Sequence, residues 1–230
     1  MFRKMICAVA ALTMTTIPAQ AQETAETEVA AAADARLAIN RPLDPVINPD
    51  MTVDRENIWL LDLSNGGRVA IRLKPDWAPG HVERIKALTL RGFYNGTPFH
   101  RVIDGFMAQG GDPTGTGQGG SQLPDLMAEF NAMPHLRGTV SMARANEEDS
   151  ANSQFFIVFE PRFSLDRKYT NFGRVIGGMQ YVDGINRGEP PAQPTTIVQA
   201  SLASQNLPPP APRAAPQIEA EVSDEDLLGS

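Results

Sequence analysis

Arg101 is the residue of this chain whose type and setting most clearly call for a chemical role. It lies in the run FHRVIDGFMAQGGD, residues 99–112, among apolar residues and without an acidic partner in the same stretch. A charged side chain is seldom buried unpaired, because its desolvation is costly. We therefore expect a guanidinium at the rim of an apolar pocket, where it donates hydrogen bonds to a ligand.

Other chemistries find little support in the sequence. Residues 115–120 fit the pattern G-x-G-x-x-G, but they follow Asp112-Pro113 and open no helix, so a dinucleotide site is not expected. The glycines predict a surface loop that passes beside the ligand pocket instead. The three histidines have no metal spacing, and no G-x-S-x-G motif accompanies them. No metal or cofactor is predicted.

The elements that must position Arg101 are mostly short apolar runs bounded by turns. The pair 58–63 and 69–73 flanks Asn65-Gly66 and predicts a β-hairpin. The segment 81–90 has apolar residues three apart and predicts an amphipathic helix that stops at Gly92. Further strands are expected at 99–103, 106–110, 138–142, 154–159, 172–176 and 195–202, and a second helix at 179–186.

The ends of the chain differ in composition from its middle. Residues 1–21, with Arg3, Lys4, an apolar run and Ala19-Gln20-Ala21, have the order of a secretory signal peptide, which predicts an exported, periplasmic protein without stable membrane insertion. The stretch 22–53 and the Pro-rich acidic tail 204–230 are expected to be flexible. One domain, residues 54–203, remains between them.

Charge and cysteine content narrow the function further. Loss of the signal peptide leaves 18 basic against 27 acidic residues, a net charge of about −9, which argues against nucleic acid as a partner. Cys7 is the only cysteine and leaves with the signal peptide. The mature chain therefore has no disulfide, no thiol nucleophile and no thiolate metal site.

The runs 99–112, GTVSMARA (138–145), NSQFFIVF (152–159) and LDRKYTNFGRVIGGM (165–179) together resemble the cyclophilins, a class of peptidyl-prolyl cis-trans isomerases, and look closest to their bacterial exported branch. The element pattern alone leaves a β-sandwich open. The resemblance implies a mainly β fold, a closed eight-stranded antiparallel β-barrel capped by two α-helices.

The resemblance also implies the site residues. Arg101, Phe106 and Gln109 are expected to be catalytic, with Gln109 orienting the guanidinium from the strand face that it shares with Met107. The backbone of Ala143–Ala145 should hold the peptide. The residues expected to bind substrate are Met107, Ala143, Arg144, Ala145, Gln154, Phe156, Leu165 and Tyr169.

The sequence departs from familiar eukaryotic cyclophilins at two of these positions and at Ser164, which precedes Leu165. They have Asn where Arg144 stands, Trp where Ser164 stands and His where Tyr169 stands. A backbone contact at residue 144 survives such a change, whereas loss of the tryptophan should weaken cyclosporin binding. Tyr169 still offers a ring face and a hydroxyl.

The resemblance implies an enzyme that accelerates rotation about X–Pro bonds in exported proteins. Its partners would be proline-containing polypeptides, and the protein itself a monomer. A non-catalytic peptide-binding or chaperone module on the same fold is the alternative, because a fold does not fix a function. The intact Arg101, Phe106 and Gln109 favour the enzyme.

Overall fold

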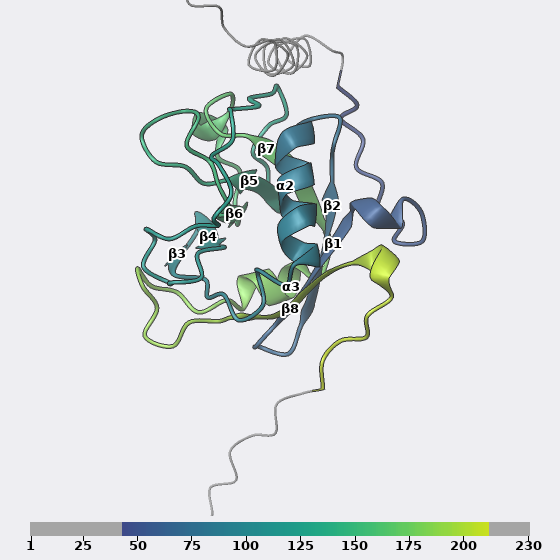
Figure 1. Cartoon of the computed structure of the whole chain (residues 1–230), viewed down its shortest axis with the longest axis vertical. Coiled ribbons are helices and arrows are strands. Elements are labelled where there is room, and N and C mark those ends of the chain that lie inside the picture. The colour runs from purple at the N-terminus through teal and green to yellow at the C-terminus, as the bar shows by residue number, and fades with distance from the viewer. Residues whose placement is uncertain (1–42, 212–230) are drawn as a thin grey trace, which may run out of the picture. The chain divides into compact units, whose positions relative to one another are not determined.

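The computed structural model describes residues 43–211, which include all the strands and helices predicted from the sequence (Figure 1). The predicted signal peptide (residues 1–21), residues 22–42 and the acidic tail from residue 212 lie outside the described residues. The strands are β1 (Ile58–Leu63), β2 (Arg68–Leu73), β3 (Arg101–Ile103), β4 (Met107–Gly110), β5 (Thr139–Met142), β6 (Phe155–Val158), β7 (Asn171–Gly177) and β8 (Ile197–Leu202). The helices are α2 (Pro79–Leu90) and α3 (Met179–Asp183).

The eight strands form one antiparallel sheet in the order β3-β4-β6-β5-β7-β2-β1-β8. The expectation of a closed barrel is not confirmed, because β3 and β8 are the two edges of this sheet, which is curled but open. Isolated single bridges join Pro98 to Thr196 and Val102 of β3 to Gly188. The segments next to the two edges therefore approach each other without forming a continuous ladder.

The β1–β2 hairpin turns at the predicted place. Gly66 has φ of +86°, and the backbone N–H of Leu63 donates to the carbonyl of Gly67 over 2.8 Å. Glycine adopts a positive φ without the steric cost that a side chain would add. The Asn65-Gly66 pair thus fixes the register in which Trp59 faces Ile71.

Helix α2 begins at Pro79, two residues earlier than the sequence pattern predicts. Proline is tolerated at the first position of a helix, because its missing N–H would have no partner there. The carboxylate of Glu129, remote in sequence, accepts hydrogen bonds from the backbone N–H groups of Gly80 and His81, each over 3.0 Å. Helix α3, by contrast, ends at Asp183 rather than at residue 186.

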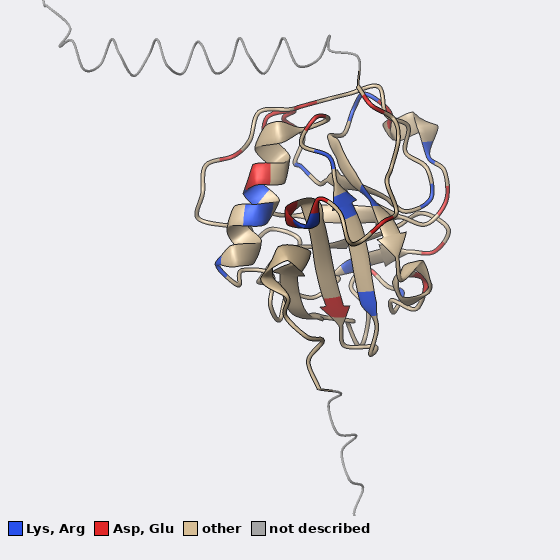
Figure 2. Cartoon of the chain, turned by 90° about the vertical axis from the view of Figure 1, so that its right-hand side faces the viewer, with Lys and Arg blue, Asp and Glu red and all other residues tan. Residues whose placement is uncertain are grey.

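The core lies between the sheet and α2. Trp59 is fully buried and makes edge-to-face contacts with Tyr94 and Phe155, with ring centres 5.2 and 4.9 Å apart. Val82, Ile85 and Leu88 of α2 pack into the same cluster. In Figure 2, Lys and Arg residues are interspersed with Asp and Glu residues along the described part of the chain.

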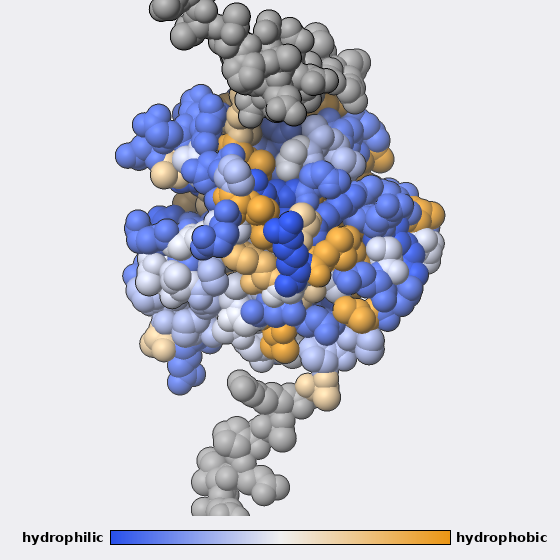
Figure 3. Space-filling model, viewed as in Figure 1, coloured by the Kyte–Doolittle hydropathy of each residue, from blue (hydrophilic) through white to orange (hydrophobic). Residues whose placement is uncertain are grey.

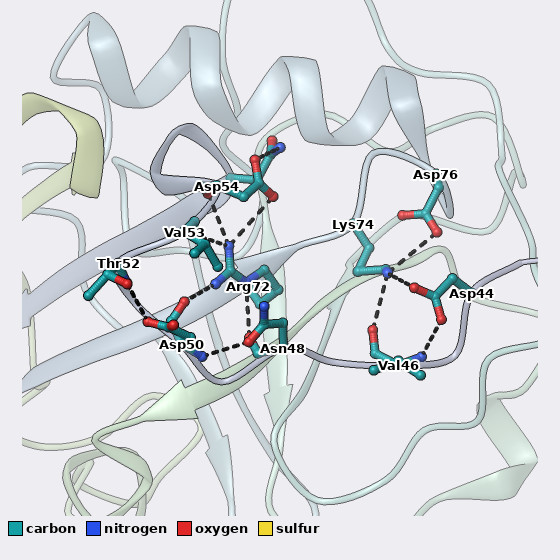
Figure 4. A network of polar contacts seen from close by, with 11 residues as sticks. Asp44, Val46, Asn48, Asp50, Thr52, Val53, Asp54, Arg72, Lys74 and Asp76 are labelled. Carbon is teal, nitrogen blue, oxygen red and sulfur yellow. Dashed lines mark hydrogen bonds and ion pairs between the residues drawn. The ribbon is translucent and has the colours of Figure 1, made fainter.

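Residues 43–54 belong to the folded unit, which therefore extends beyond the expected boundary at residue 54. The buried guanidinium of Arg72 in β2 donates to backbone carbonyls of this segment (Figure 4). The ammonium of Lys74 contacts the carbonyl of Val46 at 3.2 Å, and the Trp77 indole N–H donates to the carbonyl of Asp44 over 2.9 Å. A cavity of about 370 Å³ lies along this joint.

The described end of the chain is held as well. The side-chain amide of Gln199 donates to the carbonyl of Pro208 over 3.1 Å, and Arg68 donates to the carbonyl of Leu207 over 3.2 Å. The first residues of the predicted tail thus contact the sheet. No helix among residues 43–211 is long and apolar enough to cross a membrane.

Candidate active site

A row of paired residues crosses four neighbouring strands and builds the site. Arg101 of β3 lies opposite Gln109 of β4, Gln109 lies opposite Phe156 of β6, and Phe156 lies opposite Ser141 of β5. Directly opposed residues of antiparallel strands place their side chains on the same face of the sheet. The register therefore brings a guanidinium, an amide and an aromatic ring to one face.

A pocket of about 130 Å³ opens on this face. Its apolar side consists of Met107 and Phe156, both almost fully buried, with half-buried Phe106, Leu165 and Tyr169 packed against them. Nine of the eleven predicted site residues line it, namely Arg101, Phe106, Met107, Gln109, Ala143, Arg144, Phe156, Leu165 and Tyr169.

The two remaining predicted residues lie outside the lining. Ala145 is exposed, and its backbone N–H donates to the hydroxyl of Ser150 over 3.0 Å. Gln154 acts from behind the pocket. Its side-chain oxygen accepts from Gln109 over 2.9 Å, and its amide nitrogen donates to the carbonyls of Gly117 and Gly119.

Gln109 does not form a hydrogen bond with the guanidinium of Arg101, contrary to the orienting role predicted for it from the sequence. Its amide is bound to Gln154, and Arg101 instead donates through Nε to the carboxylate of Glu189 over 2.7 Å. Among the described residues the Nη groups of Arg101 have no hydrogen-bond partner. Sequence reasoning missed Glu189, which lies 88 residues after Arg101 in a Pro-rich turn.

The glycine-rich loop 115–120 wraps around a buried carboxylate instead of a phosphate. Asp112 accepts hydrogen bonds from the backbone N–H groups of Thr114, Gly117 and Gly119. Burial would raise the pKa of Asp112, but these hydrogen bonds, with that from the Thr114 hydroxyl, hold it below its usual value. The loop then presents its carbonyls to Gln154, beside the pocket, as the sequence predicted.

Two further arginines, Arg144 and Arg162, lie over the faces of aromatic rings that line the pocket. The guanidinium carbon of Arg144 lies 5.0 Å from the ring centre of Tyr169 and 5.9 Å from that of Phe130. The guanidinium carbon of Arg162 lies 5.1 Å from the ring centre of Phe106. All three distances fall within the range of cation–π attraction. Arg144 also donates to the carbonyl of Lys168, so it helps to hold the loop that carries Tyr169.

Behind Phe156 lies a hydrogen-bonded chain that the sequence did not reveal. The Ser141 hydroxyl is 2.9 Å from Nε2 of His135, and Nδ1 of His135 is 2.8 Å from the carboxylate of Asp166. Burial lowers the pKa of His135, against the opposing effect of Asp166. A neutral ring that donates from Nδ1 must accept at Nε2, so Ser141 is the donor. Both Ser141 and His135 have no exposed surface, which keeps this triad from acting on a substrate.

His100, the neighbour of Arg101, is also buried, and neither of its ring nitrogens has a hydrogen-bond partner among the described residues. Burial lowers its pKa, and the nearby Asp112 only partly opposes this. Within residues 43–211, no group of His, Cys, Asp and Glu side chains is placed to hold a metal ion.

Comparison with known proteins places this chain in a family. The family model described as "Cyclophilin type peptidyl-prolyl cis-trans isomerase/CLD" matches residues 60–202. The chain therefore belongs to the cyclophilin-type peptidyl-prolyl cis-trans isomerases, a family of rotamase enzymes. Its membership of a bacterial exported branch remains a prediction.

Individual relatives agree with this assignment. A "Probable peptidyl-prolyl cis-trans isomerase" of Brucella suis is 49% identical over 146 residues, which cover 59% of this chain and 74% of that protein. "Peptidyl-prolyl cis-trans isomerase B" of Bacillus subtilis is 41% identical over 128 residues, which cover 55% and 89%.

Solved structures agree as well. The cyclophilin AquaCyp293 from Hirschia baltica matches with a TM-score of 0.62 and 32% identity, over 68% of this chain and 77% of that one. A Cryptosporidium parvum cyclophilin type peptidyl-prolyl cis-trans isomerase, solved in the presence of the dipeptide Ala-Pro, matches with a TM-score of 0.59 and 28% identity, over 63% and 98%.

Proposed function

We propose that this chain accelerates rotation about X–Pro bonds by Arg101-assisted loss of amide resonance in the apolar pocket. The observation that carries the proposal is the place of the Arg101 guanidinium at the rim of a pocket that also contains Met107 and Phe156. The proline ring enters the apolar side. The Nη groups then donate to the prolyl nitrogen, whose lone pair is no longer delocalised once the peptide bond is twisted.

This chemistry needs no proton transfer, nucleophile or metal. The barrier is the resonance of the amide, about 18–20 kcal/mol. A hydrogen bond to the prolyl nitrogen forms only in the twisted state, so it lowers the barrier rather than merely tightening binding. A charged hydrogen bond contributes roughly 1.5–3 kcal/mol, or about one to two decades in rate. Positioning and exclusion of water supply the remainder.

The backbone beside the pocket is suited to hold an extended peptide. The N–H of Ala143 already donates to the carbonyl of Gln154 over 2.9 Å, and that of Ala145 donates to Ser150. The N–H and carbonyl of Arg144 form no hydrogen bond with any described residue. The predicted grip of Ala143–Ala145 therefore includes Arg144, whose backbone can pair with the residue before the proline.

The proposed substrates are proline-containing segments of exported polypeptides, and the proposed site of action is the periplasm. The Ala-Pro dipeptide named for the Cryptosporidium parvum structure supports the first part. The signal-like order of residues 1–21 supports the second. We further propose that the protein works as a monomer, since the pocket is built from residues of one chain.

The test is isomerisation of an Ala-Pro peptide, followed by protease-coupled cleavage or by NMR exchange. We expect exchange much faster than the uncatalysed isomerisation, which takes tens to hundreds of seconds. A purified, folded protein that binds the peptide without accelerating exchange would favour the non-catalytic binding module. N-terminal sequencing of the protein isolated from the periplasmic fraction should show cleavage after Ala21. Retention of the protein in the cytoplasm would contradict export.

A further inference from the structure

We propose that Glu189 is the positioning residue of Arg101. It fixes the guanidinium at Nε and so aims the two Nη groups into the proline pocket. This inference rests on the proposed role of Arg101. It assigns to a residue remote in sequence the orienting part that the sequence had given to Gln109.

The geometry of the pair carries this inference. Nε of Arg101 lies 2.7 Å from Oε2 of Glu189, a short charge-assisted hydrogen bond. An Arg side chain has many rotamers, and its planar fork points in a defined direction only when one of its nitrogens is held. A bond at Nε leaves both Nη groups available. Among the described residues neither has another partner.

Glu189 itself sits on a firmly anchored loop. Its neighbour Gly188 exchanges two backbone hydrogen bonds with Val102, the residue after Arg101, over 2.8 and 2.9 Å. The backbone N–H of Phe99 donates to the carbonyl of Thr195 over 2.9 Å. The loop 188–195 is thus attached at both ends to the stretch that carries Arg101.

Gly188 permits this attachment. Its φ is +144°, and a Cβ placed there would lie 2.6 Å from the Cα of Pro191 and 2.9 Å from the carbonyl oxygen of Pro190. Only glycine fits such a turn without displacement. The conformation at residue 188 places Glu189 immediately beside the guanidinium.

The pair is too exposed to matter much for stability. The Arg101 and Glu189 side chains are 43% and 51% exposed, and ion pairs of this kind contribute little to folding. Its effect should therefore appear in the reaction. Because the Nη groups act only on the twisted peptide bond, a misdirected guanidinium should lower kcat and leave KM unchanged.

The test compares three variants with the parent on an Ala-Pro peptide. For Glu189→Ala we expect kcat about two- to fivefold lower, an unchanged KM, and a Tm shift of no more than about 4 °C. Glu189→Gln retains an oxygen that accepts from Nε and should recover most of the rate. Adding Glu189→Ala to Arg101→Ala should cause no further loss, because the residue that it positions is gone.

Asp104→Ala is the matched control. Asp104 pairs with Arg187 over 3.0 Å and joins the same two segments, yet it does not touch Arg101. This variant should keep the parental kcat. A loss equal to that of Glu189→Ala would mean that Glu189 merely tethers the loop, and an unchanged or higher kcat in Glu189→Ala would also overturn the inference. If instead Arg101→Ala is as fast as the parent, the proposed mechanism itself fails.

Discussion

The imidazole of His135 stacks on the ring of Phe156, with centres 6.3 Å apart and planes 16° apart. Phe156 in turn meets Tyr169 edge-on, with ring centres 5.5 Å apart. The apolar wall of the pocket thus packs against a buried chain of hydrogen-bonded side chains, Ser141–His135–Asp166. That chain joins strand β5 to the loop that carries Leu165 and Tyr169.

Replacing Ser141 by Ala tests whether this chain is structural. The variant leaves Nε2 of His135 buried without a donor, which should lower the free energy of unfolding by about 1–3 kcal/mol. Urea denaturation measures the change, with exposed Ser204→Ala as a control that should leave stability unchanged. Because Ser141 never reaches the substrate, isomerase activity at a temperature where the variant is folded should persist. Abolished turnover in a fully folded variant would contradict this role.

Replacing Arg101 by Ala should lower kcat/KM by at least about one decade, the lower end of what a charged hydrogen bond contributes. The fold should persist, as circular dichroism would show, because this side chain is 43% exposed. Arg91→Ala, an exposed arginine at the end of α2, is the control and should behave like the parent. A parental rate in Arg101→Ala would refute the assigned role.

Activity should vary little between about pH 6 and 8, since no titrating group takes part in the reaction. Burial lowers the pKa values of His100 and His135, so each takes up a proton at lower pH than a free imidazole does. The check is a profile of kcat/KM over these pH values. A bell-shaped curve would point to general acid–base catalysis instead.

The same lowered pKa values of His100 and His135 should make the free energy of unfolding depend on pH. A histidine in the unfolded chain takes up a proton near pH 6.5, whereas folded His100 and His135 take it up only at lower pH. The folded state should therefore lose stability as the pH falls below about 6.5 and keep it above that value. Thermal unfolding at a series of pH values should show Tm falling in that direction.

Arg72→Ala should lower the free energy of unfolding by about 2–3 kcal/mol, because a buried guanidinium with four carbonyl partners is lost. Arg72→Lys should recover only part of this loss, since an ammonium cannot reach the same fork of acceptors. Lys86→Ala on α2 is the control and should be nearly neutral. A change below about 0.5 kcal/mol in Arg72→Ala, the range of ordinary surface substitutions, would show that the segment 43–54 adds no stability.

Ser164→Trp should tighten inhibition by cyclosporin at least about tenfold, which corresponds to 1.36 kcal/mol. The indole would restore an N–H donor and a large apolar contact next to Leu165, which lines the pocket. Peptide turnover should change much less, because the ring would lie beside the proline slot.

Phe163 is the check on this alignment, since its ring is 63% exposed in the same short helix (Phe163–Leu165) and can replace the indole in part. Phe163→Ala should therefore weaken any residual inhibition. Nanomolar inhibition of the parent by cyclosporin, or no gain from Ser164→Trp, would show that the loop is misaligned.

The strands and α2 were predictable because their signals are local. Apolar runs, the Asn65-Gly66 turn and the three-residue spacing of Val82, Ile85 and Leu88 each act over a few residues. Closure of the sheet was not predictable, since it depends on whether β3 pairs with β8, nearly a hundred residues later. The early start of α2 likewise depends on Glu129, which no local pattern connects with Gly80.

Most of the pocket came from the family resemblance, and what was missed shares a physical cause. Glu189, His135 and Asp166 act through contacts between distant segments, so their neighbours in the sequence carry no sign of them. The orange areas on the face seen in Figure 3 show that some apolar residues stay on the surface. Among the described residues, Phe163 and Leu90 are exposed. Residue type alone does not decide which apolar side chains enter a core.

The anchoring of residues 43–54 separates two boundaries that are easily treated as one. The family match begins at residue 60, yet Arg72 and Lys74, with side chains 4% and 11% exposed, find their acceptors among residues 44–54. A fragment cut to the homologous region would keep every residue of the pocket and still uncover two buried cations. For this chain, the region that the family model matches is shorter than the unit that folds.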